Sequence, residues 1–320
     1  MSIEQTTSPR SPASAGLAGG IAGAPISWGV CEVPGWGHVL PVDVVLGEMA
    51  SLGLASTELG PPGFLPDDPA QLRAVLARHG LSLVGGFLAV VLHDAGAVEA
   101  TLAEARRAVA QLAAGGSQVM VLAAATGLDG YDERPALSDQ EWATLISTAA
   151  AVADIAAQHG LRTTLHPHVG THVEQRGEVE RFLADSALPL CLDTGHLMIG
   201  GTDPLELVRQ YSDRITHVHL KDVVSAVAAR VRSGQITYMQ GVQSDMYVPL
   251  GDGDVPVAEI VATLEGAGYT GWYVLEQDTA LPDGNPLNAG RPLRDTARSL
   301  AHLNGIAAGQ ALVMAPRPIR

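Results

Sequence analysis

The chain of 320 residues contains only two cysteines, Cys31 and Cys191, which stand far apart in the sequence. Secreted proteins that depend on disulfides carry several closely spaced cysteines, so this pattern argues against such a scaffold. We expect both cysteines to be free thiols. Cys191 lies within an apolar run and is expected to be a small buried residue rather than a catalytic one.

Basic residues are also scarce, because 19 Lys and Arg stand against 34 Asp and Glu, which gives a formal net charge of -15. Nucleic-acid phosphates are bound by clustered Lys and Arg, and the sequence has no such cluster. The longest apolar stretches are broken by Gly, Pro or charge well before they reach the length of a membrane span. Residues 1–20 show no basic segment followed by an apolar core. We therefore expect a cytoplasmic protein with no nucleic-acid partner and no membrane partner.

The sequence contains neither a G-x-G-x-x-G nor a Walker motif, which argues against a doubly wound nucleotide-binding fold. It shows instead a regular alternation of apolar runs and segments with helical periodicity. The predicted strands are residues 21–28, 55–59, 81–91, 118–123, 162–166, 189–193, 215–220 and 272–276. The predicted helices are residues 41–52, 69–79, 97–114, 139–159, 177–185, 204–211, 256–267 and 293–303. Eight alternating units predict an α/β fold, a single TIM (β/α)8 barrel over residues 19–310.

Three segments fall outside this alternation. The Ser-, Pro- and Gly-rich residues 1–18 are expected to form a disordered tail, and residues 311–320 a C-terminal tail. Residues 223–255 form a connection after the seventh strand that is far longer than an ordinary strand-to-helix loop. Long loops at the catalytic face of a barrel are usually lids or substrate-recognition elements, and residues 224–233 are expected to form a short helix within this one.

The most informative stretch of the chain is LCLDTGHLMIGGTDPLELVRQYSDRITHVHLKD, residues 190–222. It contains two apolar runs, and each ends in side chains that bind metals. Because side chains alternate faces along a strand, His217, His219 and Lys221 share one face, and Cys191 and Asp193 share a face one strand earlier. We expect these faces to point into the barrel, toward the end where active sites lie.

Polar residues also stand at the ends of other predicted strands, and together they include two imidazoles and two carboxylates. Burying several charges near one barrel axis is costly without a compensating cation, so we expect one divalent metal ion there. A mixed nitrogen and oxygen donor set suits Mn²⁺, Fe²⁺, Co²⁺ or Zn²⁺ better than Mg²⁺, and Mn²⁺ is our first choice. The expected ligands are His166, Asp193, His219 and Glu276, with His168 as the alternative to His166.

The chain resembles the xylose-isomerase-like TIM-barrel superfamily of sugar isomerases and epimerases over most of its length. The motifs that carry the resemblance are APISWG, LSDQEW, LHPHVGTHVE, LCLDTGHLMIGGTDP, ITHVHLKDV and VPLGDG. The resemblance implies a metal held by residues from the last four strands, carried over here to His166, Asp193, His219 and Glu276. LHPHVGT and VPLGDG resemble the branch of dehydratases that act on cyclic polyol ketones. His166 departs from the isomerases and epimerases, which typically place Glu at this position.

The resemblance therefore implies a carbon–oxygen lyase that eliminates water from a cyclic polyol ketone such as 2-keto-myo-inositol, through a metal-stabilised enediolate. Such a reaction needs one base and one acid, whereas an epimerase needs bases on both faces of the substrate. The alternative is a metal-dependent ketose 3-epimerase or sugar isomerase that uses the same site.

Roles for individual residues follow from this reaction. Glu58 and Glu276 are the two candidates for the catalytic base, and Lys221 is expected to stabilise the ketone oxygen or to donate a proton. The expected substrate contacts are Trp28 as an apolar wall, His196 as a hydroxyl-orienting group, and His168, Lys221, Gln243 and Tyr247. Association into a homo-oligomer is left open, with Ala-rich helix faces and the apolar residues 311–316 as the features that favour it.

Overall fold

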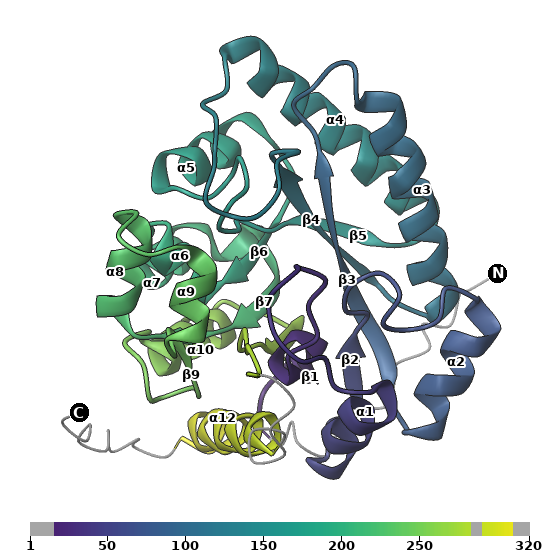
Figure 1. Ribbon diagram of the computed structural model, residues 1–320, viewed down its shortest axis with the longest axis vertical. Coiled ribbons are helices and arrows are strands. Elements are labelled where there is room, and N and C mark those ends of the chain that lie inside the picture. Colours follow the sequence, from purple (N-terminus) through teal and green to yellow (C-terminus); the bar gives the residue numbers. More distant parts are fainter. Residues whose placement is uncertain (1–15, 283–289, 310–320) are drawn as a thin grey trace.

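The computed structural model describes residues 16–282 and 290–309. Its central element is a closed barrel of parallel strands in the order β1-β10-β7-β6-β5-β4-β3-β2 (Figure 1). The barrel strands are β1 (Gly20–Gly23), β2 (Ser56–Glu58), β3 (Ser82–Val91), β4 (Val119–Ala125), β5 (Arg162–Leu165), β6 (Leu190–Asp193), β7 (Ile215–Leu220) and β10 (Trp272–Leu275). Each strand lies within or overlaps a predicted one, so the predicted single TIM barrel is confirmed.

Helices follow the strands and cover the outside of the barrel (Figure 1). The main ones are α1 (Val42–Ser51), α2 (Pro69–Arg78), α3 (Val98–Gly115), α4 (Asp139–Gln158), α5 (Arg176–Asp185), α7 (Pro204–Tyr211), α10 (Val257–Gly266) and α12 (Arg291–Ala307). Their first turns carry the expected caps: Asp68 and Asp203 each accept two backbone N–H bonds before a proline, and Ser138 forms a capping box with Glu141.

The first strand is shorter than predicted, because β1 ends at Gly23 whereas the prediction extended to residue 28. Pro25 has no backbone N–H to offer a sheet, and it begins the 3-10 helix η2 (Pro25–Trp28). Gly29 ends this turn with φ of 77°, a left-handed conformation that favours glycine. The turn carries Trp28 away from the strand direction, which changes its surroundings from those expected.

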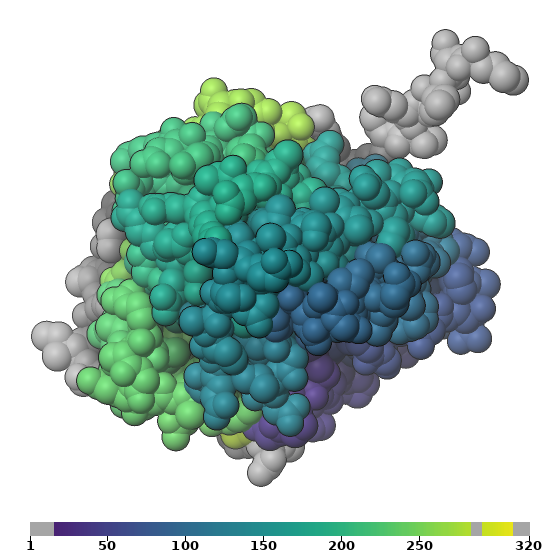
Figure 2. Space-filling view, turned by 90° about the horizontal axis from the view of Figure 1, so that it is seen from above, coloured from purple at the N-terminus to yellow at the C-terminus, as the bar shows by residue number. Residues whose placement is uncertain are grey.

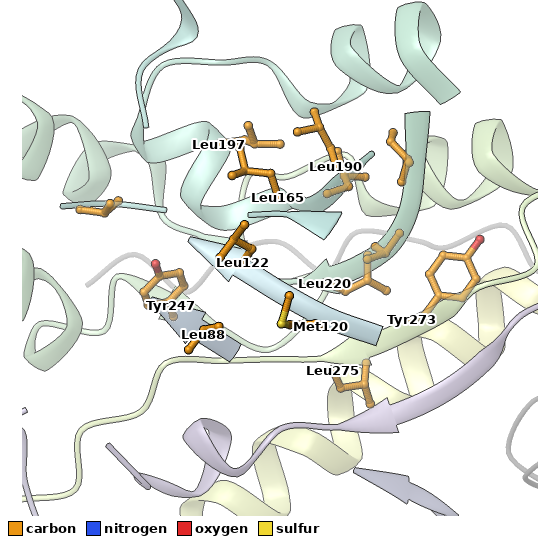
Figure 3. Close-up of a cluster of buried hydrophobic side chains, with 14 of the residues drawn as sticks. Leu88, Met120, Leu122, Leu165, Leu190, Leu197, Leu220, Tyr247, Tyr273 and Leu275 are labelled. Atoms are coloured by element: carbon orange, nitrogen blue, oxygen red, sulfur yellow. The ribbon is translucent and has the colours of Figure 1, made fainter. Parts of the chain in front are cut away.

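The outward faces of the strands form the main hydrophobic core with the helices. Val218 and Leu220, on the face of β7 opposite to the histidines, are at most 1% exposed. Figure 3 shows Leu220 within a cluster that also contains Leu122, Leu165 and Leu190 from neighbouring strands. This packing supports the predicted parity, since the apolar side chains face the helices and leave the polar set of β7 facing inward.

The long connection after β7 is a folded insertion, which we call the β7–α10 insertion and define as residues 222–256. It contains β8 (Asp222–Val223), α8 (Ser225–Arg232), α9 (Tyr238–Gln243) and β9 (Tyr247–Val248), and β8 pairs with β9 in antiparallel fashion. The predicted short helix is therefore present as α8. The carboxylate of Asp222 accepts backbone N–H bonds from Gly251, Gly253 and Val255, which fixes the end of the insertion.

The insertion lies beside the segment that follows β4. Figure 2 shows these two parts, in green and in teal, in contact on one face of the molecule. The backbone N–H of Tyr238 donates to Asp132, and the rings of Tyr238 and Tyr131 lie 4.9 Å apart between centroids. These contacts hold the insertion against the segment that follows β4, and its role as a lid or a substrate-recognition element stays a prediction.

Two further differences from the predictions concern short segments. Helix α6 (Thr194–Ile199) was not predicted, and it begins directly after β6 with Asp193 as its N-cap. Leu17 lies within the predicted tail of residues 1–18, yet it is buried in the core, and Ala18 donates its backbone N–H to Glu265. The remainder of that tail up to residue 15, and the predicted C-terminal tail of residues 311–320, lie outside the described residues. Within the described ranges, no helix combines the length and apolar character that a membrane crossing requires.

Candidate metal centre and cavity

Four side chains from neighbouring strands meet at the carboxyl-terminal end of the barrel. His166 Nε2 lies 3.2 Å from Asp193 Oδ2 and 3.2 Å from His219 Nδ1. His219 Nδ1 lies 3.6 Å from Asp193 Oδ2 and 2.6 Å from Glu276 Oε2. Two ligands that share an ion at about 2.1 Å lie roughly 3.0–3.4 Å apart. Both separations from His166 fall in this range, the one between His219 and Asp193 is slightly longer, and the one between His219 and Glu276 is shorter. The structure thus brings together the four residues that the sequence analysis proposed as ligands.

Local structure explains why these atoms converge. Residues at the same level of adjacent parallel strands are neighbours, and Asp193 is paired in register with His219. The two oxygens of Asp193 have different partners. Oδ1 accepts hydrogen bonds from the backbone N–H groups of Gly195 and His196 at the start of α6. Oδ2 remains directed toward His166 and Lys221. Capping of α6 therefore orients the carboxylate.

The environment of His219 is dominated by negative charge. Burial disfavours a charged imidazole, but surrounding groups that include Glu276 and Glu58 raise the pKa of His219 well above its usual value. A proton on this ring occupies the place where a metal ion would sit, and metal binding would release it. The surroundings of His219 therefore favour a positive charge at Nδ1, whether a proton or a cation supplies it.

Lys221 is the positive charge within this cluster. Its side chain is 1% exposed, and Nζ lies 3.1 Å from Asp193, 3.1 Å from Glu276 and 2.9 Å from Asp278. These carboxylates hold the pKa of Lys221 well above its usual range despite burial. One ammonium group offsets one of the four buried carboxylate charges that Glu58, Asp193, Glu276 and Asp278 carry. A divalent cation would compensate most of the remainder, so the donor set and the charge balance both fit a metal ion.

Asp278 is a member of this site that the sequence analysis missed. It stands two residues after Glu276, on the same face of the chain as β10 ends, and its carboxylate accepts a hydrogen bond of 2.5 Å from the hydroxyl of Tyr238. Burial raises the pKa of Asp278 above its usual value. The signal that could have revealed it is the parity of E-Q-D in residues 276–278, which places a second carboxylate beside the first.

Three of the four converging side chains border a cavity of about 190 Å³ at the mouth of the barrel, and Asp193 is not among its lining residues. His166, His219, Glu276, Glu58 and Asp278 lie on its polar side. Its apolar walls include Trp36, Phe87 and Tyr131, whose rings come from three separate segments of the chain. A polar floor under aromatic walls is the usual form of a small-molecule site.

Two histidines beside the metal cluster differ in their access to the cavity. His168 borders it, stacks on His196 with ring centroids 3.8 Å apart, and has Nδ1 2.7 Å from the carbonyl oxygen of Val169. Burial lowers the pKa of His168 to about 3, so the ring is neutral. His196 is enclosed, with Nδ1 accepting the backbone N–H of Val169. The structure places His166, and not His168, against Asp193 and His219.

Several of the predicted substrate contacts lie elsewhere. Trp28 is fully buried and donates Nε1–H to Glu48 outside the cavity, so the expectation that it forms a cavity wall is wrong, and Trp36 occupies that role. The turn at η2 directs Trp28 away from the cavity. Gln243 is exposed and contacts the carbonyl of Gly35. Tyr247 is buried, with its hydroxyl 2.9 Å from that of Tyr238, and Lys221 is enclosed by carboxylates; neither borders the cavity.

The fold and the cluster of metal-type ligands define a class of barrel enzymes with polar groups at the ends of the last four strands. In agreement with this, the model of the protein family described as "Xylose isomerase-like TIM barrel" matches residues 46–303 of the chain. A solved structure of the IOLI protein with a bound zinc atom superimposes with a TM-score of 0.65 at 14% identity, covering 89% of this chain and 98% of that one. At that identity the likeness shows the fold alone.

Sequence relatives narrow the class. The inosose dehydratase of Geobacillus kaustophilus is 33% identical over 87% of this chain and 94% of its own length. That of Klebsiella pneumoniae is 31% identical over 87% of this chain and 97% of its own length. The chain belongs to the inosose dehydratase family within the xylose isomerase-like TIM barrels, and it is an enzyme of the carbon–oxygen lyase type.

Proposed function

We propose that the chain is a metal-dependent dehydratase that eliminates water from a cyclic polyol ketone such as 2-keto-myo-inositol. The observation that carries the proposal is the convergence of His166, Asp193, His219 and Glu276 at the end of the barrel, where all but Asp193 border one cavity. The name printed for the relatives from Geobacillus kaustophilus and Klebsiella pneumoniae supports the choice of substrate.

We further propose that these four side chains hold one divalent ion and that this ion is Mn²⁺. Two imidazole nitrogens and two carboxylate oxygens form a donor set of intermediate softness, which suits Mn²⁺, Fe²⁺, Co²⁺ or Zn²⁺ better than the all-oxygen cations Mg²⁺ and Ca²⁺. When bound, the ion would supply Lewis acidity to the ketone oxygen. The zinc atom in the IOLI protein is a finding on that protein, and it agrees with the general type of ion.

The cavity favours an uncharged substrate. The charged side chains that border it are the carboxylates Glu32, Glu58, Glu104, Glu276 and Asp278, and no Lys or Arg is among its described lining residues. A phosphate or carboxylate on the substrate would be repelled by this set, since anion recognition in proteins relies on Arg, Lys or helix N-termini. A neutral polyol ring fits, because its C–H faces can pack on Phe87 and Tyr131 while its hydroxyls meet the polar floor.

Residues of the chain would perform the proton transfers of the elimination. Both expected bases border the cavity. Glu58 Oε1 lies within hydrogen-bond distance of two imidazoles, whereas Glu276 contacts one imidazole and Lys221, so we propose Glu276 as the base. We propose His168 and Asp278 as the groups that orient substrate hydroxyls, since both border the cavity. Lys221 holds Asp278 and Glu276 in place through its two ion pairs.

A reconstitution assay tests the proposal. Protein freed of metal by chelation is loaded with Mn²⁺, Co²⁺ or Mg²⁺ and mixed with 2-keto-myo-inositol, and the ultraviolet absorption of the dione product is followed. We expect turnover with Mn²⁺ and Co²⁺ and little with Mg²⁺. A protein that leaves this ketone unchanged but converts a ketohexose, with solvent deuterium retained in a hydrated sugar when the reaction is run in D₂O, would be an epimerase instead.

A further inference from the structure

Glu58 is the one carboxylate of the polar floor that comes from the opposite side of the barrel. It ends β2, and its Oε1 lies 2.7 Å from His217 Nε2 and 3.2 Å from His219 Nε2. The same oxygen therefore accepts from two imidazoles that stand one above the other on β7. Glu58 is 5% exposed, so these contacts are shielded from bulk water and from competing hydrogen bonds.

The backbone around Glu58 is shaped to make this contact. Between β2 and β3 the register shifts, because Thr57 pairs with Leu83 while Glu58 pairs with Gly85, which leaves one extra residue in β3. A bulge of this kind changes the direction in which the neighbouring side chains point. Gly85 then stands opposite the carboxylate, and a Cβ atom there would lie 3.0 Å from Glu58 Oε1. Glycine at this position leaves the room that the carboxylate occupies.

The contact determines which nitrogen of His219 is available. A carboxylate oxygen can only accept, so His219 Nε2 must carry the proton in its bond to Glu58. Once metal binding has released the proton from Nδ1, this nitrogen is the free donor atom, and it faces His166, Asp193 and Glu276. Metal-binding histidines commonly donate their second N–H to a carboxylate in this way, which fixes tautomer and ring orientation.

We propose that Glu58 is a positioning residue that holds His219, with His217 beneath it, in the tautomer and orientation needed to bind the metal, and that it is not the catalytic base. The inference rests on the metal centre of the proposed function. His217 supports the arrangement, because its Nε2–H shares the same oxygen and its ring contacts that of His219 at 5.3 Å between centroids. The two bonds also leave Oε1 poorly available to take a proton from substrate.

The two roles of Glu58 differ in what its substitution changes. A positioning residue acts on metal affinity, and loss of such a contact typically weakens binding about 10- to 100-fold. A general base acts on the chemical step, and its loss typically lowers kcat about 10²- to 10⁴-fold. Measuring the dissociation constant for Co²⁺ separately from kcat at saturating metal therefore distinguishes them.

The experiment titrates Co²⁺ into the full-length metal-free protein in competition with a coloured chelator, for wild type, Glu58→Gln and Glu58→Leu. We expect Glu58→Leu to bind Co²⁺ about 10- to 100-fold more weakly. The amide oxygen in Glu58→Gln can still accept both N–H bonds, so this conservative variant should retain affinity closer to wild type. With saturating metal, Glu58→Gln should keep kcat within about tenfold of wild type, well short of the loss typical of a missing base.

Two glycine variants keep the test informative even where Glu58→Leu fails to fold. Gly85 does not have a positive φ, so Gly85→Ala is compatible with the backbone, and its methyl group should displace Glu58 Oε1 by a few tenths of an ångström. We expect weaker Co²⁺ binding in the same direction as Glu58→Leu. Gly86→Ala is the matched control, because a Cβ there meets Leu112 and Leu59 on the outer side of the strand. It should lower stability without changing the dissociation constant.

Unchanged Co²⁺ affinity in both Glu58→Leu and Gly85→Ala would overturn the positioning role. Normal Co²⁺ affinity in Glu58→Gln together with a kcat loss of about 10²-fold or more would assign Glu58 as the base instead. Both outcomes leave the proposed dehydratase intact. Failure of the wild-type protein to bind Co²⁺ at all would overturn the metal centre, and the role of Glu58 with it.

Discussion

The two halves of the barrel interior differ in chemistry. Strands β5, β6, β7 and β10 lead to His166, Asp193, His219 and Glu276, all within one cluster of short contacts. Strands β1, β3 and β4 contribute small or apolar buried side chains instead, among them Ala22, Val84, Val119 and Val121. The first group we call the polar half of the barrel, and the second the apolar half.

The difference teaches how the fold supports a reactive centre. Charges on adjacent strands of the polar half lie close enough to share a single counter-charge, which isolated strand-end residues would not do. The apolar half removes water and supplies the cavity wall, and a low local dielectric strengthens every electrostatic contact nearby. Glu58 is the exception, since it belongs to β2 and contacts His217 and His219 across the barrel.

The strongest way to break the polar half is to remove a ligand. We expect His219→Ala to lose bound metal and to lower activity by roughly 10³-fold or more, since Lewis-acid stabilisation is worth several kcal/mol. Elemental analysis of the purified variant and the dione assay measure both effects. Circular dichroism should show a folded protein. His159→Ala, at an exposed position at the end of α4, is the control. Retained metal in His219→Ala would contradict the ligand assignment.

A second test removes the positive charge of the polar half. Lys221→Met keeps most of the side-chain volume but leaves Asp193, Glu276 and Asp278 without their shared ammonium group. We expect the free energy of unfolding of the metal-free protein to fall by about 3 kcal/mol, measured by urea denaturation, because unpaired buried charges are costly. Mn²⁺ should restore part of this loss, since it supplies positive charge to the same carboxylates.

A surface ion pair provides the matched control for that experiment. Arg298 is 60% exposed and pairs with Asp252, so Arg298→Met should cost less than about 1 kcal/mol and should not respond to Mn²⁺. If Lys221→Met and Arg298→Met lower the free energy of unfolding equally, the buried charges of the polar half cost no more than exposed ones. The distinction between the two halves would then fail.

The apolar half should affect substrate binding more than the chemical step. Phe87 borders the cavity and packs against His166 and His168, with ring centroids 5.7 Å and 5.5 Å away. We expect Phe87→Ala to raise KM by about tenfold, with kcat changed much less, because it removes contact made equally in ground and transition states. Leu128→Ala, at an exposed leucine that does not border the cavity, should leave both constants unchanged. A fall in kcat with normal KM would place Phe87 in the chemistry.

Most residues of the polar half could be predicted from the sequence, because the alternation of side chains along a strand is visible within a few neighbouring residues. Strand parity alone places His217, His219 and Lys221 on one face, and the barrel topology brings Asp193 beside His219. The eight helices were found within a few residues for the same reason, since their periodicity and N-terminal caps are encoded in short windows. Such windows say which residues share a face, and the closed sheet then brings the faces together.

The apolar half could not be predicted in the same way, because its contacts join segments far apart in the chain. The sequence favoured Trp28 as a cavity wall, but the turn at η2 carries Trp28 away and Trp36 borders the cavity instead. The bulge that sets Glu58 opposite Gly85 has no marker in either strand. Long-range contacts also explain the one member of the polar half that was missed, Asp278, because its partners are Lys221, directly after β7, and Tyr238 of the β7–α10 insertion.

The smallest expected effect concerns the two cysteines, which lie in different parts of this arrangement. Burial raises the pKa of Cys31, which borders the cavity on its apolar side, to about 12. The thiolate is the reactive form, so alkylation of Cys31 by iodoacetamide should be slow at pH 8 and should rise roughly tenfold per pH unit above it.

Peptide mass spectrometry reads Cys31 and Cys191 separately, and the urea-unfolded chain, where both thiols regain ordinary reactivity, is the reference. Cys191 is fully buried inside the barrel and should remain unmodified in the folded protein throughout. A polyol ketone in the cavity should slow Cys31 further, because it would cover the approach to the sulfur. Alkylation of Cys31 at pH 8 as fast as in urea would mean that the apolar side of the cavity is more open to water than its packing indicates.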